Sequence, residues 1–375
     1  MSKSEKSSPA TSSFYSHPLM GVGLANLFRL FRLYGWPEAG YRGKAFMFFL
    51  SALARTPFAL IDAIIVALKR KSVEPLEAPV FILGHWRSGT THLLNIMSKA
   101  GRFAYISPFA TALPGSFLSI TKLFRPLLVK SLPKGRYIDG VPVEAESPQE
   151  DEIALSNVTL NSFFHALYFP KDFYETFNRG LFFDGVSADE VAEWSEKLQA
   201  FYLKLQIENP GKRLLIKNPV YTARVEEILK IYPDAKFIHI YRNPYKIFFS
   251  MRNFYQKLLA EFPLQEHALD NLDDHILSVY TRMMANLERD IAKIPDGHFI
   301  ELKYEDVQKN PLKELENIYE ALDLGPFSED KAAFETYLKS VKGYKKNVYD
   351  FPDADLARLD IHLRKYILKG GYRRP

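Results

Sequence analysis

Residues 84–91, which read Gly-His-Trp-Arg-Ser-Gly-Thr-Thr, combine the residue types and the spacing that are needed to bind an anion. A short apolar run precedes this segment and an apolar helical pattern follows it, so we expect a turn between a strand and a helix. Backbone N–H groups in such a turn, together with the N-terminus of the next helix, form a cradle for a phosphate-like group. The residues that would line this cradle are Arg87, Ser88, Gly89, Thr90 and Thr91.

The cation of this segment stands in a different place from that of a nucleotide-hydrolysing P-loop. Four residues separate Gly84 from Gly89, as in a P-loop, but Thr90 occupies the position of the nucleotide-binding lysine. The cation has moved forward to Arg87. An ATPase or kinase would lose the lysine that contacts the β- and γ-phosphates, so the pattern favours a different phosphate-containing ligand, with a P-loop nucleotide kinase as the alternative.

Two further cations stand at the ends of predicted strands. Lys217 follows one apolar run, and Arg242 follows another. Asn243 and Pro244 can cap and begin a helix, on which Ser250 lies about two turns further. An arginine fork and a hydroxyl group suit a phosphate monoester. Since ligands bind at the carboxyl ends of parallel strands, we expect these side chains and residues 84–91 to form one site.

These segments resemble the sulfotransferases that use 3′-phosphoadenylyl sulfate (PAPS). In that family a Lys or Arg precedes Ser-Gly-Thr-Thr in the loop that binds the 5′-phosphosulfate. Three further segments match in order, so the resemblance covers about residues 79–350. They are residues 215–219 (Leu-Ile-Lys-Asn-Pro), residues 241–244 (Tyr-Arg-Asn-Pro) followed by Ser250, and residues 303–306 (Lys-Tyr-Glu-Asp). The chain is most similar to the broad bacterial-type branch, with its His-Trp-Arg-Ser-Gly-Thr-Thr-His and Pro-Gln-Glu-Asp-Glu segments.

The resemblance implies a metal-independent enzyme of the EC 2.8.2 type with a P-loop-like fold. It would move a sulfuryl group from PAPS to a hydroxyl or amine of a small acceptor and release PAP. Arg87 and Lys217 would neutralise the phosphosulfate, and Arg242 and Ser250 would hold the 3′-phosphate. An inactive, membrane-associated PAPS-binding scaffold is a second alternative.

The base that deprotonates a hydroxyl acceptor stays open. Glu150 and Glu152 are the candidates, within residues 147–152 (Ser-Pro-Gln-Glu-Asp-Glu). Glu150 also forms a capping-box pattern with Ser147, and Asp151 and Glu152 suit a helix N-terminus, so a structural role is equally compatible. His165, which lies among aromatic residues, is another candidate base or a core histidine.

Three features depart from the family pattern or stay unassigned. Where some relatives have a Glu shortly after the loop, this chain has Ser107 and Pro108. Where cytosolic relatives have a Trp after the paired threonines, it has His92, so Trp86 is either an adenine contact or a core residue. The basic residues 343–347 would close over the 3′-phosphate or form a solvated surface.

The elements that must position these residues are five short apolar strands that alternate with helical patterns. Such alternation predicts an α/β fold with a P-loop-like parallel sheet flanked by helices. Residues 107–213 contain no comparable strand and predict a helical insertion that shapes the acceptor site. We expect residues 76–375 to form the catalytic domain. The predicted strands are Val80–Leu83, Phe103–Ile106, Leu214–Ile216, Phe237–Tyr241 and Phe299–Leu302.

Residues 1–75 predict a polar, disordered leader and an apolar helical extension, without a secretory signal. Residues 46–68 are long enough to span a bilayer, but Arg55 and Asp62 lie near their middle, and each central charge costs about 2.5–3.5 kcal/mol. Thr56 and Pro57 look like an N-cap and a first helical position. We therefore expect two apolar helices that pack on the catalytic core, with peripheral membrane contact through residues 44–70 as the alternative.

Composition sets the broad class. The 375 residues carry 49 Lys and Arg against 44 Asp and Glu, a net charge of +5, which is too weak for a surface that coats nucleic acid. The absence of cysteine excludes disulfide scaffolds and thiol chemistry. We expect a cytoplasmic location, with peripheral membrane contact as the alternative, and the apolar helices favour a hydrophobic or lipid-like acceptor. The oligomeric state stays open.

Overall fold

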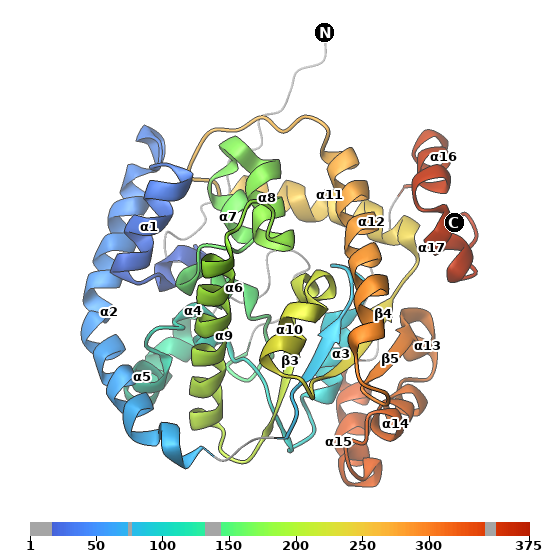
Figure 1. The fold of residues 1–375 in the computed structure, drawn as a ribbon, viewed down its shortest axis with the longest axis horizontal. Coiled ribbons are helices and arrows are strands. Elements are labelled where there is room, and N and C mark those ends of the chain that lie inside the picture. The colour runs from blue at the N-terminus through green and yellow to red at the C-terminus, as the bar shows by residue number, and fades with distance from the viewer. Residues whose placement is uncertain (1–16, 74–76, 132–143, 342–349) are drawn as a thin grey trace.

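A five-stranded parallel sheet with the order β2-β3-β1-β4-β5 lies at the centre of the structure (Figure 1). The structure is a computed structural model that describes residues 17–73, 77–131, 144–341 and 350–375. All five predicted strands are confirmed, because short apolar runs of this kind are buried on both faces of a parallel sheet. They are β1 (Val80–Leu83), β2 (Phe103–Ala104), β3 (Arg213–Lys217), β4 (Lys236–Tyr241) and β5 (Phe299–Lys303).

Helices cover both faces of the sheet, and β1 shows how its residues divide between them. Phe81 and Leu83 pack in a core with helices α9 (Ala188–Glu208) and α10 (Val225–Ile231). Val80 and Ile82 face the opposite core, with α3 (Thr90–Met97), α14 (Pro311–Ala321) and α15 (Phe327–Ser340). This alternation follows from the two-residue period of a strand. The sheet is therefore fixed from both sides, and its carboxyl edge is a rigid platform.

Helices alone fill the described part of the segment between β2 and β3, as predicted for residues 107–213. They precede and follow a gap at residues 132–143, which are outside the described residues. The helices are α4 (Pro108–Ala112), α5 (Phe117–Ser131), α6 (Glu152–Val158), α7 (Phe164–Tyr168), α8 (Phe173–Phe182) and α9.

A third core joins the N-terminal helices to the rest of the chain. It contains Leu27 and Phe31 of α1 (Leu24–Tyr34), Phe48 of α2 (Arg42–Lys69), and Trp86 of the glycine-containing turn. The N-terminal segment therefore packs against the same body as the candidate site. The other helices of this core are α7, α8, α11 (Pro244–Glu261), α12 (Leu272–Asp290), α16 (Asp353–His362) and α17 (Arg364–Lys369); α13 (Tyr304–Lys309) follows β5.

The expectation of two helices within residues 46–68 is wrong. One 28-residue helix, α2, runs through Pro57, and the Thr56 hydroxyl donates to the Ala52 carbonyl at 3.0 Å instead of capping a new helix. Tertiary contacts on both sides of the proline hold the helix together: Arg55 donates to carbonyls of Gly21 and Val22, and Asp62 accepts from α5. These contacts outweigh the local signal.

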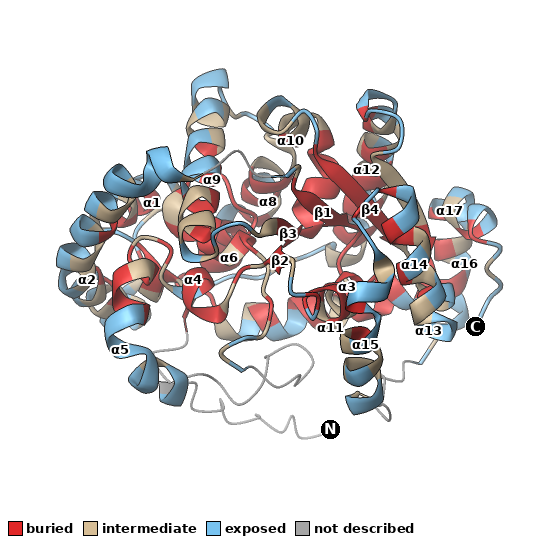
Figure 2. Cartoon of the chain, turned by 90° about the horizontal axis from the view of Figure 1, so that it is seen from below, coloured by how far each residue is buried: buried red, intermediate tan, exposed pale blue. Residues whose placement is uncertain are grey.

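The expectation that this segment packs on the core holds for only one face of α2. Only Phe48, Ala52 and Asp62 of α2 are buried. The helix with its flanking turns, Ala39–Ser72, is long and apolar enough to cross a membrane by length and composition, yet only 11% of its most apolar 18-residue window is buried. Figure 2 shows α2 at the edge of the molecule with a largely exposed surface.

Candidate functional site

The glycine-containing turn between β1 and α3 needs both of its glycines. Gly84 has φ +145°, and a Cβ there would approach the Ile240 carbonyl oxygen at 2.5 Å. Gly89 has φ +104°, and a Cβ there would overlap the ring of Tyr304. Arg87 itself adopts φ +70°. A residue other than glycine rarely takes a positive φ without a tertiary reason, so the backbone at Arg87 is shaped by its surroundings. The turn leaves the first N–H groups of α3 beside it.

Gly89→Ala should destabilise the protein more than Gly211→Ala. Both glycines have positive φ, which costs an alanine about 1–2 kcal/mol, but the Gly211 site is open whereas Gly89 faces the Tyr304 ring. Overpacking should add about 1–3 kcal/mol at Gly89. Denaturant unfolding of both variants measures the difference. Equal losses of stability would show that the overlap between the added methyl group and the Tyr304 ring costs nothing.

One end of the turn gathers three of the predicted phosphate-binding residues. Arg87 Nε donates to Ser250 Oγ at 2.9 Å, and Arg242 Nη1 donates to the Arg87 carbonyl at 2.9 Å. The Arg242 guanidinium also lies 4.5 Å from the centre of the Tyr304 ring. The predicted helix start is confirmed, since Asn243 Oδ1 accepts from the N–H of Tyr245 at 3.0 Å and α11 begins at Pro244. Strand β4 and helix α11 thus bring Arg242 and Ser250 to the turn.

Two buried polar atoms at this end have no hydrogen-bond partner among the described residues. They are Ser88 Oγ and Arg242 Nε. A buried polar group without a partner costs about 1–3 kcal/mol, so such atoms are expected where a ligand completes the hydrogen bonding. With two arginines and the amides of the turn beside them, these residues fit a phosphate group.

The other end of the turn gathers Lys217 and Glu150. The Lys217 side chain is 2% exposed, forms an ion pair with Glu150, and has its Nζ 3.3 Å from Thr91 Oγ1. Glu150 is 24% exposed and is the more accessible member of the pair. Strand β3 therefore delivers its terminal lysine to the start of α3, next to a carboxylate from the helical insertion.

A buried hydrogen-bonded cluster locks these two segments together. Asn218 Nδ2 donates to Asp151 Oδ1 and to Glu152 Oε2, both at 2.8 Å. Asp151 also accepts from the hydroxyls of Tyr202 and Tyr221, and Glu152 from Ser162 at 2.7 Å. Asp151 and Glu152, which follow Glu150 in the chain, thus hold Asn218, which follows Lys217.

Burial raises the pKa of both carboxyl groups in this cluster. The pKa of Asp151 rises to about 6 against the effect of its hydrogen bonds, and that of Glu152 rises to about 7 against the positive charge of Arg224 and its own hydrogen bonds. Both are fully enclosed, with 0% and 1% exposure. Desolvation therefore dominates these two acids.

The capping-box interpretation of Glu150 is wrong. Helix α6 begins at Glu152 with Asp151 as its N-cap residue, and Ser147 Oγ accepts instead from the N–H of Glu144 at 2.9 Å. Glu150 therefore lies before the helix, where it can pair with a lysine 67 residues further along the chain.

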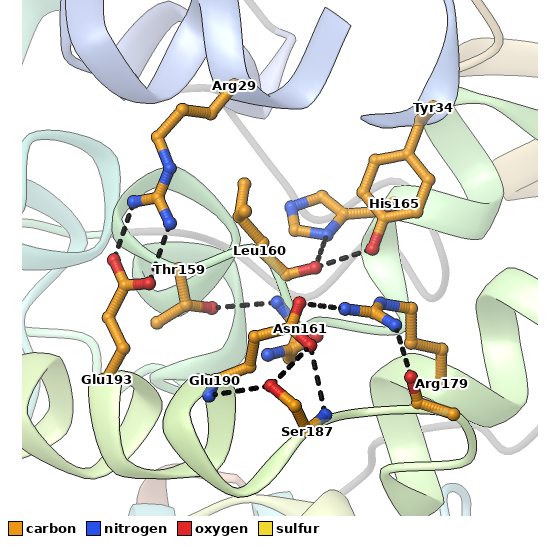
Figure 3. Close-up of polar contacts among 11 residues, drawn as sticks. Arg29, Tyr34, Thr159, Leu160, Asn161, His165, Arg179, Ser187, Glu190 and Glu193 are labelled. Atoms are coloured by element: carbon orange, nitrogen blue, oxygen red, sulfur yellow. Dashed lines mark hydrogen bonds and ion pairs between the residues drawn. The ribbon is translucent and has the colours of Figure 1, made fainter. Parts of the chain in front are cut away.

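His165 and Trp86 are core residues. The His165 ring is fully buried between the carbonyl oxygens of Ser156 (2.9 Å) and Leu160 (3.2 Å), and burial lowers its pKa to about 4. Figure 3 shows that Tyr34 of α1 reaches the same Leu160 oxygen. Trp86 is 4% exposed and packs among aromatic rings of the third core. The basic residues 343–347 lie outside the described residues.

Sequence reasoning missed two residues of this site. In the sequence Asn218 stands out only as the neighbour of Lys217, although an Asn-Pro step after a strand signals a capped turn whose side chain is fixed. Tyr304 stands out only as part of a matching segment. Its contacts with Gly89 and Arg242 join residues more than 60 positions away, which no local pattern reveals.

The sulfotransferase family model matches residues 79–329 of this chain. Two relatives carry the name omega-hydroxy-beta-dihydromenaquinone-9 sulfotransferase Stf3, from Mycobacterium bovis (strain ATCC BAA-935 / AF2122/97) and Mycobacterium tuberculosis (strain CDC 1551 / Oshkosh). Each is 30% identical over 300 residues, which cover 80% of this chain and 76% of the relative.

Solved structures agree on the fold. Sulfotransferase STF9 from Mycobacterium avium matches with a TM-score of 0.67 and 18% identity, over 94% of this chain and 97% of that one. Sulfotransferase STF1 from Mycobacterium tuberculosis H37Rv matches with a TM-score of 0.60 and 17% identity, over 83% and 84%. The family match runs from β1 to the first residues of α15 and includes both ends of the turn described above. This chain therefore belongs to the sulfotransferase family and is an enzyme of its bacterial type.

Proposed function

We propose that this sulfotransferase transfers a sulfuryl group from PAPS to a hydroxyl (or amine) group of a lipid-like acceptor and releases PAP. The observation that carries the proposal is the convergence of two clusters on one turn: Arg87, Ser250 and Arg242 at one end, and Lys217 with Glu150 at the other. PAPS, when bound, supplies a sulfuryl group on a phosphate leaving group. No metal ion and no nucleic-acid partner forms part of the proposal.

The phosphate-binding roles follow from the donors at each position. Arg242 and Ser250 hold the 3′-phosphate, with Arg242 fixed by its contacts to the Arg87 carbonyl and the Tyr304 ring. The residues around the 5′-phosphosulfate are Ser88, Gly89, Thr90 and Thr91 together with Arg87, whose positive charge opposes the charge of the donor.

Lys217 and Glu150 act on the reacting groups. Lys217 is buried, so its charge stabilises the negative charge that develops on the leaving phosphate without competition from water. Glu150 accepts the proton that the acceptor hydroxyl loses. Glu152 is the other candidate base, but hydrogen bonds from Ser162 and Asn218 occupy its two oxygens, which favours Glu150.

The acceptor class rests on two observations. The relatives named above act, by their name, on an omega-hydroxy-dihydromenaquinone, a lipid-like molecule with a hydroxyl group. This chain also exposes apolar helices beside the catalytic body. We therefore propose a hydroxylated, lipid-like acceptor and a cytoplasmic location at a membrane surface.

Arg242→Ala should weaken PAP binding about 10- to 100-fold, because hydrogen bonds to a charged group contribute about 1.5–3 kcal/mol. The measurement is a thermal shift titration with PAP, and with ATP plus Mg²⁺ in parallel. At a hundred times its dissociation constant, PAP should stabilise the wild type by about 2.7 kcal/mol. Arg282→Ala is the matched control, since Arg282 also stacks on an aromatic ring, that of Phe182 at 3.9 Å.

Two outcomes would contradict the proposal. A preference for ATP plus Mg²⁺ over PAP would exclude PAPS as the donor. Selective binding of PAP without release of PAP from PAPS, over a panel of hydroxylated lipids and small alcohols, would exclude the proposed acceptor class.

A further inference from the structure

Helices α1, α2 and α5 turn large apolar side chains away from the body of the protein. Among the described residues, all exposed large hydrophobic side chains except Ile361 and Leu368 lie on these helices or at Trp36, two residues after the end of α1. On α2 they form one stripe, and the side chains of Leu53, Leu60, Ile64 and Leu68 are 51–77% exposed. Their spacing of four or seven residues places them on one face of the helix.

The three helices form one continuous flank. The rings of Phe28 on α1 and Phe49 on α2 lie 6.4 Å apart, and those of Phe58 on α2 and Phe124 on α5 lie 5.8 Å apart. In Figure 1 the three helices lie together at the side of the molecule away from β5, and in Figure 2 they lie at the side away from α16 and α17. We refer to this surface, made by the outer faces of α1, α2 and α5, as the apolar flank.

The charged residues in the middle of α2 point toward the protein. Arg55 donates to the Val22 carbonyl at 2.6 Å and to the Gly21 carbonyl at 3.0 Å. Asp62 has 0% exposure, accepts from the Ser119 N–H at 2.9 Å, and pairs with Lys204 of α9 at 3.1 Å. A helix on a water-facing surface has the opposite arrangement, with its apolar face inward and its polar face outward. The outer face of α2 is therefore adapted to an apolar medium.

The apolar flank is also positively charged at its edges. Arg42 and Lys44 stand at the start of α2 and Lys69, Arg70 and Lys71 at its end. The three helices contain one acidic residue, the buried Asp62. An apolar surface bordered by cations, with no exposed acid, complements a bilayer that contains anionic lipid.

Building on the membrane-surface location proposed above, we propose that the apolar flank is the surface that docks this enzyme onto an anionic membrane, with α2 lying in the plane of the interface. A second copy of the chain is a poor occupant, because a symmetric interface would place cations against cations. A spanning orientation is disfavoured because Asp62, Lys204 and the polar helix α9 would then be carried into the hydrocarbon. Helix α2 has 28 residues and is about 42 Å long. Its inner face rests on the protein, so its outer face can contact the membrane at the same time.

Vesicle flotation of the full-length protein tests this inference. The wild type should float with phosphatidylcholine vesicles that contain phosphatidylglycerol. Its partition constant for pure phosphatidylcholine should be lower, by about fivefold for each cation near the surface. Leu60→Gln/Ile64→Gln should lower the partition constant about 100-fold, because burying each side chain is worth about tenfold. Ile361→Gln/Leu368→Gln is the matched control: it removes the same residue types at 76% and 66% exposure and should float like the wild type.

Three results would overturn the inference. The first is that the wild type binds neither kind of vesicle. The second is that the membrane-bound protein resists extraction at alkaline pH, which would indicate a spanning helix. The third is that sedimentation shows a dimer that Leu60→Gln/Ile64→Gln dissociates. Leu53→Gln/Leu68→Gln changes other turns of the same stripe and should reproduce the loss, so a folding defect in one variant does not decide the outcome. Loss of binding in both pairs at unchanged melting temperature supports the membrane-docking role.

Discussion

Lys217→Met should lower kcat by about 10²–10³-fold, as does removal of one well-placed donor from a preorganised site. The lysine side chain is 2% exposed, so neither water nor a buffer cation can take the place of its charge. Methionine keeps most of the side-chain volume and removes only the ammonium group. Because Arg242 and Ser250 lie at the other end of the turn, PAP affinity should fall much less than turnover. Steady-state kinetics and a PAP titration of the same variant measure both quantities.

Lys230→Met is the control for this substitution. Lys230 lies on α10, is 65% exposed, and pairs only weakly along its helix with Glu226 at 3.3 Å. Its loss should leave kcat unchanged, since exposed pairs of this type contribute about 0.3–0.5 kcal/mol to stability. A kcat for Lys217→Met within a few-fold of the wild type would exclude Lys217 from charge stabilisation. An equal loss of PAP affinity and kcat would instead indicate that Lys217 serves binding.

The sheet, and the approach of Arg242 and Ser250 to the glycine-containing turn, could be predicted because their signals are local. The residues of β1 are apolar without interruption, which is typical of a strand buried on both faces. Arg242 is followed at once by Asn243 and Pro244, whose capping geometry places Ser250 on the next helix. The residues that the loop needs are also contiguous, so their order alone indicates the turn.

The other features depend on contacts between distant segments. The pairing of Glu150 with Lys217 joins positions 67 residues apart, and the local pattern with Ser147 pointed to a helix cap instead. The Thr56-Pro57 step indicates a helix start, but the contacts of Arg55 with Val22 and of Asp62 with Ser119 keep α2 as one continuous helix. The direction of the α2 stripe could not be predicted, because an amphipathic period is the same whether its apolar face points inward or outward.

The pH dependence of stability gives a second large effect, carried by Glu152. Burial raises the pKa of Glu152 from 4.5 to about 7 in the folded protein. Between these values the folded protein holds a proton that the unfolded chain has lost, so stability falls as pH rises. The contribution is fully present below pH 4.5 and is lost as pH passes 7, by about 3 kcal/mol in total. Glu152→Gln cannot ionise, so its stability relative to the wild type should rise by about that amount from pH 4.5 to 8.

Unfolding by urea at intervals between pH 4.5 and 8 measures this difference, and Glu193→Gln provides a control of opposite sign. Hydrogen bonding to Arg29, which stays charged over this range, holds the pKa of Glu193 below its usual value of 4.5. Its stabilising contribution is therefore lost only as pH falls below 4.5, and Glu193→Gln should differ from the wild type by a constant amount between pH 5 and 8. A constant difference for Glu152→Gln as well would mean that Glu152 ionises normally in the folded protein.

Because glutamine can still accept from Asn218, Glu152→Gln should keep its activity if Glu150 is the base. A loss of activity at unchanged stability would instead transfer that role to Glu152.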